Sequence, residues 1–321
     1  MNASAIDPGR VLGYKFEESS FDYSIRDVIL YALGIGAAAL DQTNPAELAF
    51  VYEGESGRNL QVLPTFGVLF PSSLVSELLK VPGLQFDPKL LLHGEQYLEV
   101  LRPLSSEGQI KNTSSVTGLH DKGKAAMIEV ETRSCDAQTG QLVCINRSTC
   151  VLRGAGGFSS HTTSPSTSGR DSSTSAKPAR SSAASKSGRK PDLSRTPDFV
   201  HEERTAPDQA LVYRLSGDHN PLHADPAFAK AAGFPRPILH GLCSLGFAVR
   251  AVLKKCCGDD VSLFKSVQAR FLLHVFPGET LVTEIWQTPG STSLTFRTSV
   301  KERQKPVLSG TIRLNLAHSR I

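Results

Sequence analysis

Residues 241–258 read Gly-Leu-Cys-Ser-Leu-Gly-Phe-Ala-Val-Arg-Ala-Val-Leu-Lys-Lys-Cys-Cys-Gly. The large apolar residues of this stretch recur on one face of a helix: Leu242, Leu245, Val249, Val252 and Leu253. The alanines between them favour a helix, and Gly258 is suited to end it. Downstream, residues 293–300 and 307–314 alternate apolar and polar side chains, which is typical of antiparallel strands covered on one face. A helix followed by such strands predicts an α+β fold, with the helix packed against an antiparallel sheet.

The chain contains two segments that resemble each other in order. Residues 30–34 (Leu-Tyr-Ala-Leu-Gly) are similar to residues 212–217 (Val-Tyr-Arg-Leu-Ser-Gly), and residues 91–95 (Leu-Leu-His-Gly-Glu) are similar to residues 272–279 (Leu-Leu-His-Val-Phe-Pro-Gly-Glu). The matched tyrosines are 182 residues apart and the matched glycines 184. Two matches at nearly one offset indicate a duplication. We therefore expect each half to hold one main apolar helix followed by several strands.

A basic, Ser/Thr-rich segment at residues 155–195 separates these halves. It has almost no large apolar residue, so burial cannot offset the entropy lost on ordering. We predict a flexible linker between a domain at residues 1–154 and a second domain at residues 196–318. Between Arg153 and Arg195 there are eight basic and two acidic residues, so the net charge of +4 originates in this segment.

The composition excludes several classes of protein. With 40% apolar and 21% charged residues, the chain is typical of a globular protein. It has no run of 18 apolar residues, so we expect no membrane span. The basic segment has no interleaved aromatic residues, and nucleic-acid binding is not expected. A non-catalytic module that binds an acidic partner through this segment stays as an alternative.

Residues 217–223 read Gly-Asp-His-Asn-Pro-Leu-His and bring together an acid, an amide and an imidazole. Glycine and proline break regular structure, so we expect Asp218, Asn220 and His223 on a shaped loop. A carboxylate and a histidine held close together can control the protons of one water molecule. The simpler reading is that Asp218 bridges its own turn.

Other polar residues near this loop have less specific readings. His219, His223 and Asp225 suggest a metal site, but they are too few for a convincing one, and we expect none. His240 is expected to pack or cap at the start of the helix, and Cys243 to fill the core.

The D-x-N-P-x-H pattern of residues 218–223 resembles the signature of MaoC-like (R)-specific enoyl-CoA hydratases of the peroxisomal hydratase 2 type. Further motifs of this family follow one another in the first half: Tyr-Ala-Leu-Gly-Ile-Gly at 31–36, Leu-Pro-Thr-Phe-Gly-Val at 63–68 and Leu-His-Gly-Glu-Gln at 92–96. The resemblance implies two hot-dog folds in one chain, each a long helix wrapped by a curved antiparallel sheet. Together they would form a pseudo-dimeric double hot-dog.

The family resemblance also implies an activity, the reversible syn hydration of trans-2-enoyl-CoA to (3R)-3-hydroxyacyl-CoA in fatty acid β-oxidation. Asp218 and His223 would hold the water, with the pKa of His223 near its usual value, and Asn220 would bind the water or brace the loop. The N–H of Gly241, at a helix N-terminus, suits the negative charge that develops on the thioester oxygen. No cofactor is expected, since CoA is part of the substrate.

The family's contacts with the CoA thioester carry over to specific positions of this chain: His93, Gly94, Lys122, Gly241 and Phe271. Lys122 is alternatively a solvated turn lysine. Glu53 and His240 are expected in structural roles around the site. Residues 34–40 (Gly-Ile-Gly-Ala-Ala-Ala-Leu) have neither acid nor imidazole, so the first half should be non-catalytic and accommodate the acyl chain.

The chain ends in Ser319-Arg320-Ile321, which resembles the Ser-Lys-Leu peroxisomal signal. We therefore expect a peroxisomal protein that binds the import receptor through this tripeptide, and a homodimer. The alternative enzymes are other hot-dog proteins that act on acyl thioesters, either a dehydratase with carrier-protein substrates or a thioesterase.

Overall fold

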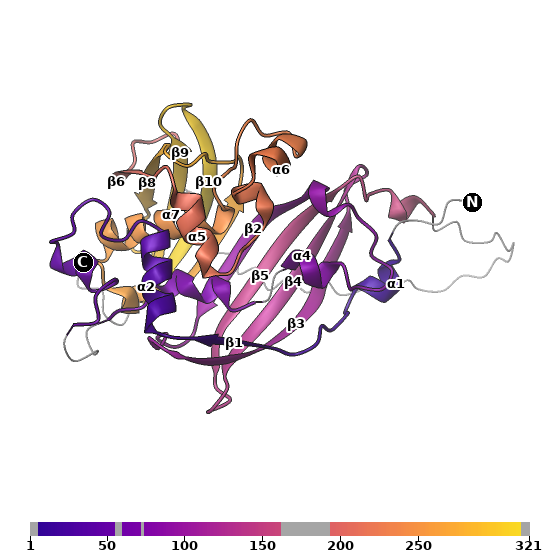
Figure 1. Ribbon diagram of the computed structural model, residues 1–321, viewed down its shortest axis with the longest axis horizontal. Coiled ribbons are helices and arrows are strands. Elements are labelled where there is room, and N and C mark those ends of the chain that lie inside the picture. Colours follow the sequence, from indigo (N-terminus) through magenta and orange to yellow (C-terminus); the bar gives the residue numbers. More distant parts are fainter. Residues whose placement is uncertain (1–5, 55–59, 72–73, 162–192, 316–321) are drawn as a thin grey trace, which may run out of the picture.

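The computed structural model describes residues 6–54, 60–71, 74–161 and 193–315 (Figure 1). The strands of the first half are β1 (Ser19–Tyr23), β2 (Leu91–Val100), β3 (Gly108–Asp121), β4 (Ala125–Asp136) and β5 (Leu142–Arg153). Those of the second half are β6 (Phe199–Arg204), β7 (Phe264–Phe271), β8 (Thr280–Gln287), β9 (Ser293–Val300) and β10 (Lys305–Leu314).

The helices are short, with one exception in the second half. The first half has the α-helices α1 (Pro8–Val11), α2 (Ile25–Gly34), α3 (Pro45–Leu48) and α4 (Leu74–Leu78), and the 3₁₀ helices η1 (Pro64–Leu69), η2 (Pro88–Leu90) and η3 (Phe158–His161). The second half has α5 (Gln209–Tyr213), α6 (Pro226–Ala231) and the long α7 (Gly241–Cys256), with the 3₁₀ helices η4 (Arg214–Ser216), η5 (Pro221–His223) and η6 (Val261–Leu263).

All ten strands form one sheet, and its strand order confirms the duplication. Outward from the centre, the first half runs β2, β5, β4, β3, β1 and the second runs β7, β10, β9, β8, β6. Each strand therefore stands where its counterpart stands in the other half. The halves meet where β2 pairs antiparallel with β7, and an ion pair of 2.6 Å between Arg270 and Glu95 crosses this seam. The expected pseudo-dimer is present within a single chain.

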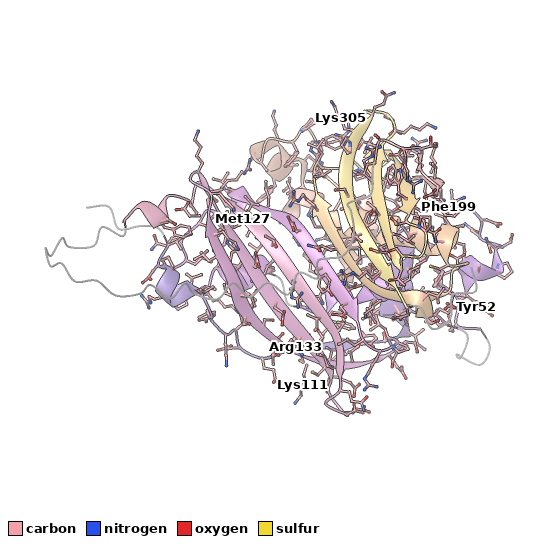
Figure 2. All side chains as sticks on the ribbon, turned by 180° about the vertical axis from the view of Figure 1, so that it is seen from behind. Tyr52, Lys111, Met127, Arg133, Phe199 and Lys305 are labelled. Carbon is pink, nitrogen blue, oxygen red and sulfur yellow. The ribbon has the colours of Figure 1, made fainter. Side chains whose placement is uncertain are left out.

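The predicted helix at residues 241–258 is confirmed as α7. Its apolar face is buried, it contacts β6, β7, β8 and β10, and the sheet curves around it (Figure 1). This is the helix-in-sheet packing of a hot-dog fold. Cys243 is fully buried in the core, as expected. From the opposite side, the strands that carry Met127, Arg133 and Lys305 lie in front of the helices (Figure 2).

The first half has the ten-residue helix α2 followed by the strands β2–β5, but its described residues include no long helix at the position that α7 occupies in the second half. The six-residue η1 contacts β2, and α4 and η2 follow it in the chain before β2 begins. The second half has the sixteen residues of α7 before β7. Pro64 begins η1 and Pro71 follows it, and a proline cannot continue a helix because it has no N–H. Instead, the side-chain amides of Asn112 and Asn146 donate from the sheet to backbone carbonyls of this segment, at 2.7 and 2.9 Å.

The two sequence matches behind the predicted duplication have different outcomes. Tyr31 and Tyr213 lie on helices that follow the first strand of each half, and their ring centroids are 6.0 Å apart, so this match is confirmed. The match of residues 91–95 with residues 272–279 is wrong. The first stretch lies on β2, whose counterpart is β7, whereas the second follows β7 and leads into β8. A short apolar-His-Gly pattern occurs by chance in both a strand and a loop.

The predicted linker at 155–195 begins and ends within packed structure. Ala155 and Phe158 are buried against the first half, and Arg195 donates a hydrogen bond to β8. Residues 162–192 lie outside the described residues, as does the predicted C-terminal tripeptide. In the part of the chain that the structure describes, no helix has the length and hydropathy needed to cross a membrane.

A buried cluster of charged residues around Arg250 joins the two halves. Arg250 on α7 donates to the Glu203 carboxylate at 3.0 Å and to the Ile35 carbonyl at 2.7 Å, and its Nε lies 3.7 Å from Glu47. Ile35 and Glu47 belong to the first half. Residues 35–47 of the first half are therefore fixed to α7.

Candidate active site

The loop predicted to carry the chemistry is built by local backbone interactions. Gly217 has a φ of 117° and ends η4, a conformation that residues with a side chain rarely adopt. The Asp218 carboxylate accepts a hydrogen bond from the N–H of Asn220 at 3.1 Å. The Asn220 side chain in turn accepts from the N–H of Leu222 at 3.0 Å and caps η5. Asn220 therefore braces the loop, and η5 turns His223 back toward Asp218.

His223 is held in one tautomer. Its Nδ1 lies 2.8 Å from the carbonyl oxygen of Ile238. Because a carbonyl only accepts, Nδ1 carries the proton and Nε2 of the neutral ring has a free lone pair. Burial lowers the pKa of His223 below its usual value, which differs from our expectation of an ordinary pKa. The ring is therefore neutral at physiological pH and able to accept a proton.

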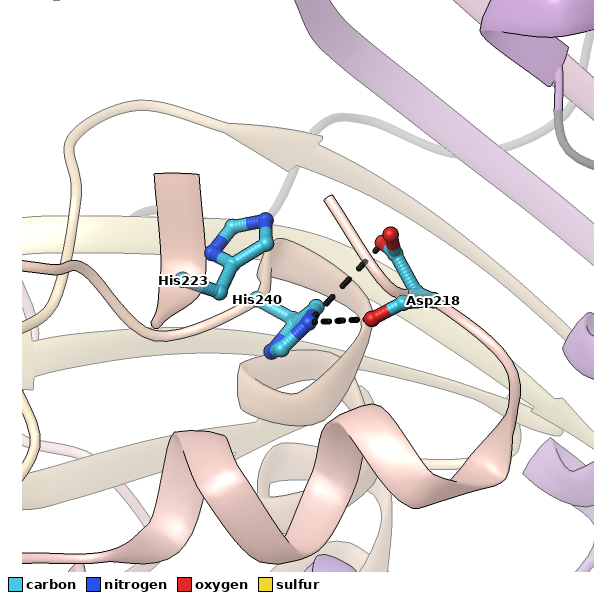
Figure 3. A group of neighbouring side chains, drawn as sticks. All are labelled: Asp218, His223 and His240. Atoms are coloured by element: carbon cyan, nitrogen blue, oxygen red, sulfur yellow. Dashed lines mark hydrogen bonds and ion pairs between the residues drawn. The ribbon is translucent and has the colours of Figure 1, made fainter. Parts of the chain in front are cut away.

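His240 lies next to both catalytic candidates and contacts Asp218 (Figure 3). It occupies the N-cap position of α7, but its side chain makes no capping hydrogen bond. Its Nε2–H donates to the backbone carbonyl of Asp218 at 3.2 Å, and its ring stacks on His223 with the centroids 3.6 Å apart. Burial, followed by the neighbouring His223, lowers the pKa of His240 to about 3. His240 is therefore a neutral packing partner, as expected, and not a capping residue.

Asp218, His223 and His240 have potential ligand atoms within 4.8 Å of one another. This group differs from the trio considered from the sequence, since Asp225 instead caps α6 through an N–H of Ala227 at 2.7 Å. The two imidazoles stack nearly parallel, whereas a metal ion must lie in the plane of each ring that binds it. The arrangement favours water held between an acid and a base.

Four of the expected thioester contacts come together from both halves. An added Cβ at Gly241 would lie 3.1 Å from the Phe271 ring, and the Phe271 ring centroid is 4.9 Å from that of His93. Burial lowers the pKa of His93 to about 4, and its Nε2–H donates to the Glu95 carbonyl at 3.1 Å. Gly94 lies between His93 and Glu95, where the pairing of β2 with β5 shifts register. The start of α7 thus faces the seam between β2 and β7.

Two other expected residues lie outside this group. Lys122 is exposed at the tip of the β3–β4 hairpin, where its N–H donates to the Ala125 carbonyl at 2.8 Å. Glu53 is half-buried at the end of the segment that precedes residues 55–59, and it is not a member of the Asp218 cluster.

The small residues at 34–38 pack closely and leave no open space where they stand. An added Cβ at Gly36 would lie 2.5 Å from the Phe247 ring on α7, and one at Gly34 would lie 3.4 Å from Tyr213. Their small size is therefore required for contact between the halves. The accommodation of an acyl chain by the first half stays a prediction.

A cavity of about 200 Å³ lies nearby and was missed by sequence reasoning. It extends from the catalytic loop to the first half and is lined by Phe21, Asp22, Asp27, Leu30, Phe66, Leu69, Leu215, Ser216 and Gly217. These residues come from β1, α2, η1 and η4, so only the tertiary fold brings them together. The motif Leu-Pro-Thr-Phe-Gly-Val contains one of them, Phe66, but no sequence signal marks it as a cavity wall.

Comparison with known proteins supports the same assignment. A family model described as the MFE-2 hydratase 2 N-terminal domain matches residues 21–154, and the MaoC-like domain matches residues 189–311. The chain is 50% identical to the peroxisomal enoyl-CoA hydratase 2 of Arabidopsis thaliana, over 94% of this chain and 93% of that protein. It is 39% identical to the mouse peroxisomal multifunctional enzyme type 2, over 93% of this chain but only 37% of the longer enzyme.

A solved structure agrees with the fold over the full length. The crystal structure of a MaoC-like dehydratase from Phytophthora capsici has 34% identity and a TM-score of 0.75, covering 98% of this chain and all of that one. The match to the Arabidopsis protein covers 94% of this chain and therefore includes both halves. The chain belongs to the enoyl-CoA hydratase 2 family of MaoC-like double hot-dog proteins.

Proposed function

We propose that this chain catalyses the reversible hydration of trans-2-enoyl-CoA to (3R)-3-hydroxyacyl-CoA, as a hydro-lyase of peroxisomal fatty acid β-oxidation. The observation that carries the proposal is the loop geometry. Ligand atoms of the Asp218 carboxylate and the His223 ring lie within 4.8 Å of one another, and the Ile238 carbonyl holds the proton of the neutral His223 ring on Nδ1. The names of the Arabidopsis and mouse relatives support the same activity and compartment.

In this proposal Asp218 and His223 hold one water molecule between them. The separation of their polar atoms is small enough for a single water to contact both. As the water oxygen bonds to C3, His223 Nε2 accepts one proton and Asp218 orients the other. The proton accepted by His223 then passes to C2 on the same face, and the other proton stays on the hydroxyl group at C3. The elements of one water are thus added across the double bond. Asn220 acts through the loop and not on the water.

Gly241 is proposed to stabilise the enolate. The first N–H groups of α7 have no partner within the helix, and the helix dipole is positive at this end. A Cβ at position 241 would crowd the Phe271 ring at 3.1 Å and narrow the approach of the thioester. An N–H at this point can donate to the thioester oxygen as negative charge develops.

The remaining substrate contacts are assigned by position. His93, Gly94 and Phe271 would line the path of the CoA arm at the seam between β2 and β7, and Lys122 would reach its phosphates from the tip of the β3–β4 hairpin. The acyl chain would extend past Gly217 into the cavity between the halves, whose walls are mainly apolar but include Asp22 and Asp27. The first half, without an acid–base pair, then contributes binding but no chemistry.

Three further parts of the proposal concern the cellular form of the protein. The final tripeptide, residues 319–321, would bind the peroxisomal import receptor. The chain would form a homodimer of double hot-dog subunits. The reaction would need no metal and no cofactor besides the CoA of its substrate.

The test of the catalytic assignment is substitution of Asp218→Asn and His223→Gln. Each change should lower kcat for hydration of decenoyl-CoA by about 10²–10⁴-fold while the fold is retained. His219→Gln is the matched control, since His219 is an exposed neighbour outside the cluster, and it should leave kcat unchanged. Retained activity in the Asp218 or His223 variant would refute the assignment.

A second candidate is a dehydratase, which is the activity named for the Phytophthora structure, and we consider carrier-protein thioesters as its substrates. Hydration is reversible, so the same residues would serve both directions. Comparison of kcat/KM for matched CoA and carrier-protein thioesters separates the two. A preference for the carrier-protein ester would favour this second candidate.

A further inference from the structure

Buried polar atoms without a protein partner gather behind the catalytic loop. Among the described residues there are five such side-chain atoms: Tyr31 Oη, Tyr213 Oη, Arg214 Nε, Ser216 Oγ and His240 Nδ1. Three of these residues, Tyr213, Arg214 and Ser216, lie in the short stretch before Gly217 and Asp218. The other two contact Tyr213, with ring centroids 6.0 Å away for Tyr31 and 4.9 Å away for His240. Buried polar atoms normally find partners, so their gathering at one place requires an explanation.

The chemistry of these atoms is complementary. His240 donates Nε2–H to Asp218, so its buried Nδ1 has a lone pair and can only accept. Burial raises the pKa of both tyrosines, so each keeps its O–H as a donor. Thr65 lies close enough to Tyr31 to oppose this pKa shift, but the pair does not meet hydrogen-bond geometry. Donors and acceptors that do not reach each other are the usual surroundings of buried water, which needs two to four polar partners.

The position of this group connects two regions already described. On one side, the His240 ring stacks on His223 and its Nε2 binds the Asp218 backbone. On the other side, Ser216 lines the cavity of about 200 Å³. Tyr31 follows Leu30, which also lines the cavity, and packs against Phe66 with centroids 5.6 Å apart. The polar atoms therefore stand between the cavity and the catalytic loop.

We propose that Tyr31, Tyr213, Ser216 and His240 form a buried water site, which supplies the water consumed in each hydration from behind the catalytic loop. One water is used per turnover, with its hydroxyl bonded to C3 and its remaining proton to C2. The site must therefore refill once per cycle. A bound thioester occupies the opening near Gly241 and Phe271, and a long acyl chain occupies the cavity, so the water held in this buried site is the supply that remains. The supply role rests on the proposed hydratase activity, whereas the existence of the water site does not.

Tyr213→Phe tests the site because it removes one hydroxyl and keeps the ring. Tyr23→Phe is the matched control, since the buried Tyr23 donates to the Ser105 carbonyl at 3.2 Å. A high-resolution crystal structure of the wild type should show water within hydrogen-bond distance of Tyr213 Oη and His240 Nδ1. Tyr213→Phe should lower the urea midpoint of unfolding, since a hydrated hydroxyl is lost. A higher midpoint would mean that the hydroxyl was unsatisfied, and it would overturn the water site.

The supply role has its own readout in substrate length. Tyr213→Phe should lower kcat for decenoyl-CoA by about tenfold and for crotonyl-CoA much less, because a short acyl chain leaves the cavity open to solvent. An equal loss with both substrates would indicate a disturbed loop and overturn the supply role. An ordered water without any change in kcat would overturn it as well. Wild-type protein without hydratase activity would instead refute the proposed function and leave the crystallographic result intact.

Discussion

At the scale of single residues, His240 links the parts of the site. It holds the Asp218 backbone through Nε2, covers one face of His223 and stands directly before Gly241. His240→Phe keeps a ring against His223 but leaves the Asp218 carbonyl without this donor. We expect kcat to fall about tenfold, since a lost buried hydrogen bond costs about 1–2 kcal/mol. Steady-state kinetics with decenoyl-CoA measures this, and a variant with wild-type kcat would show that the contact does not position Asp218.

The lowered pKa of His223 predicts a pH dependence. The neutral ring is the form that accepts a proton, and burial lowers the pKa at which it would become charged. Activity should therefore persist below pH 6.5, the ordinary histidine value, before it falls on the acidic side. The profile of kcat/KM against pH reports this ionisation in the free enzyme. An acidic limb centred above pH 6.5 would contradict the burial of His223.

The sequence alone was sufficient to locate Asp218, Asn220 and His223, because their spacing is local and Gly217 marks the turn. It could not give the tautomer of His223, which is set by the carbonyl of Ile238, fifteen residues away. The pKa expected for His223 was wrong for the same reason, since burial is a property of the tertiary structure.

At the scale of elements, α7 is placed by close contact with the first half. An added Cβ at Gly246 would lie 2.5 Å from Ile35 Cγ2. Alanine normally stabilises a helix interior relative to glycine by about 1 kcal/mol. Here Gly246→Ala should instead destabilise the protein by about 1–3 kcal/mol because the contact is overpacked. Urea unfolding measures the change, and Lys255→Ala on the exposed side of α7 is the control. A stabilised Gly246→Ala protein would disprove the close approach.

The helical periodicity of residues 241–258 predicted α7 because its apolar face is continuous. The corresponding helix of the first half was predicted only by analogy with the second. Pro64 and Pro71 limit that segment, and the amides of Asn112 and Asn146 replace helical hydrogen bonds with bonds to the sheet. Hydrogen bonds from side chains on distant strands leave no periodic pattern in the sequence.

At the scale of the whole molecule, the two halves are joined by the ten-stranded sheet and by the cluster around Arg250. Arg250→Met should leave Glu203 and Glu47 buried with fewer partners and reduce the free energy of unfolding by about 3–5 kcal/mol. Arg297→Met is the control, because Arg297 pairs with Glu284 at a partly exposed site, and we expect a loss below about 1 kcal/mol. Equal effects of the two changes would contradict a structural role for the cluster between the halves.

The duplication was predictable from the tyrosine match, and the strand order confirms it. The cavity between the halves was not, since its walls come from β1 and α2, from η1 and from η4, three stretches that are distant in sequence. The asymmetry between a catalytic second half and a first half without an acid–base pair is visible in the sequence. The cavity beside η1 in the first half can be recognised only from the tertiary structure.

The central claim is that Asp218 and His223 hydrate the enoyl thioester on one defined face. The most direct measurement is the chirality of the product that the wild-type protein forms from trans-2-decenoyl-CoA. We predict (3R)-3-hydroxydecanoyl-CoA alone. Formation of the (3S) product, or of no hydroxyacyl product, would contradict the account.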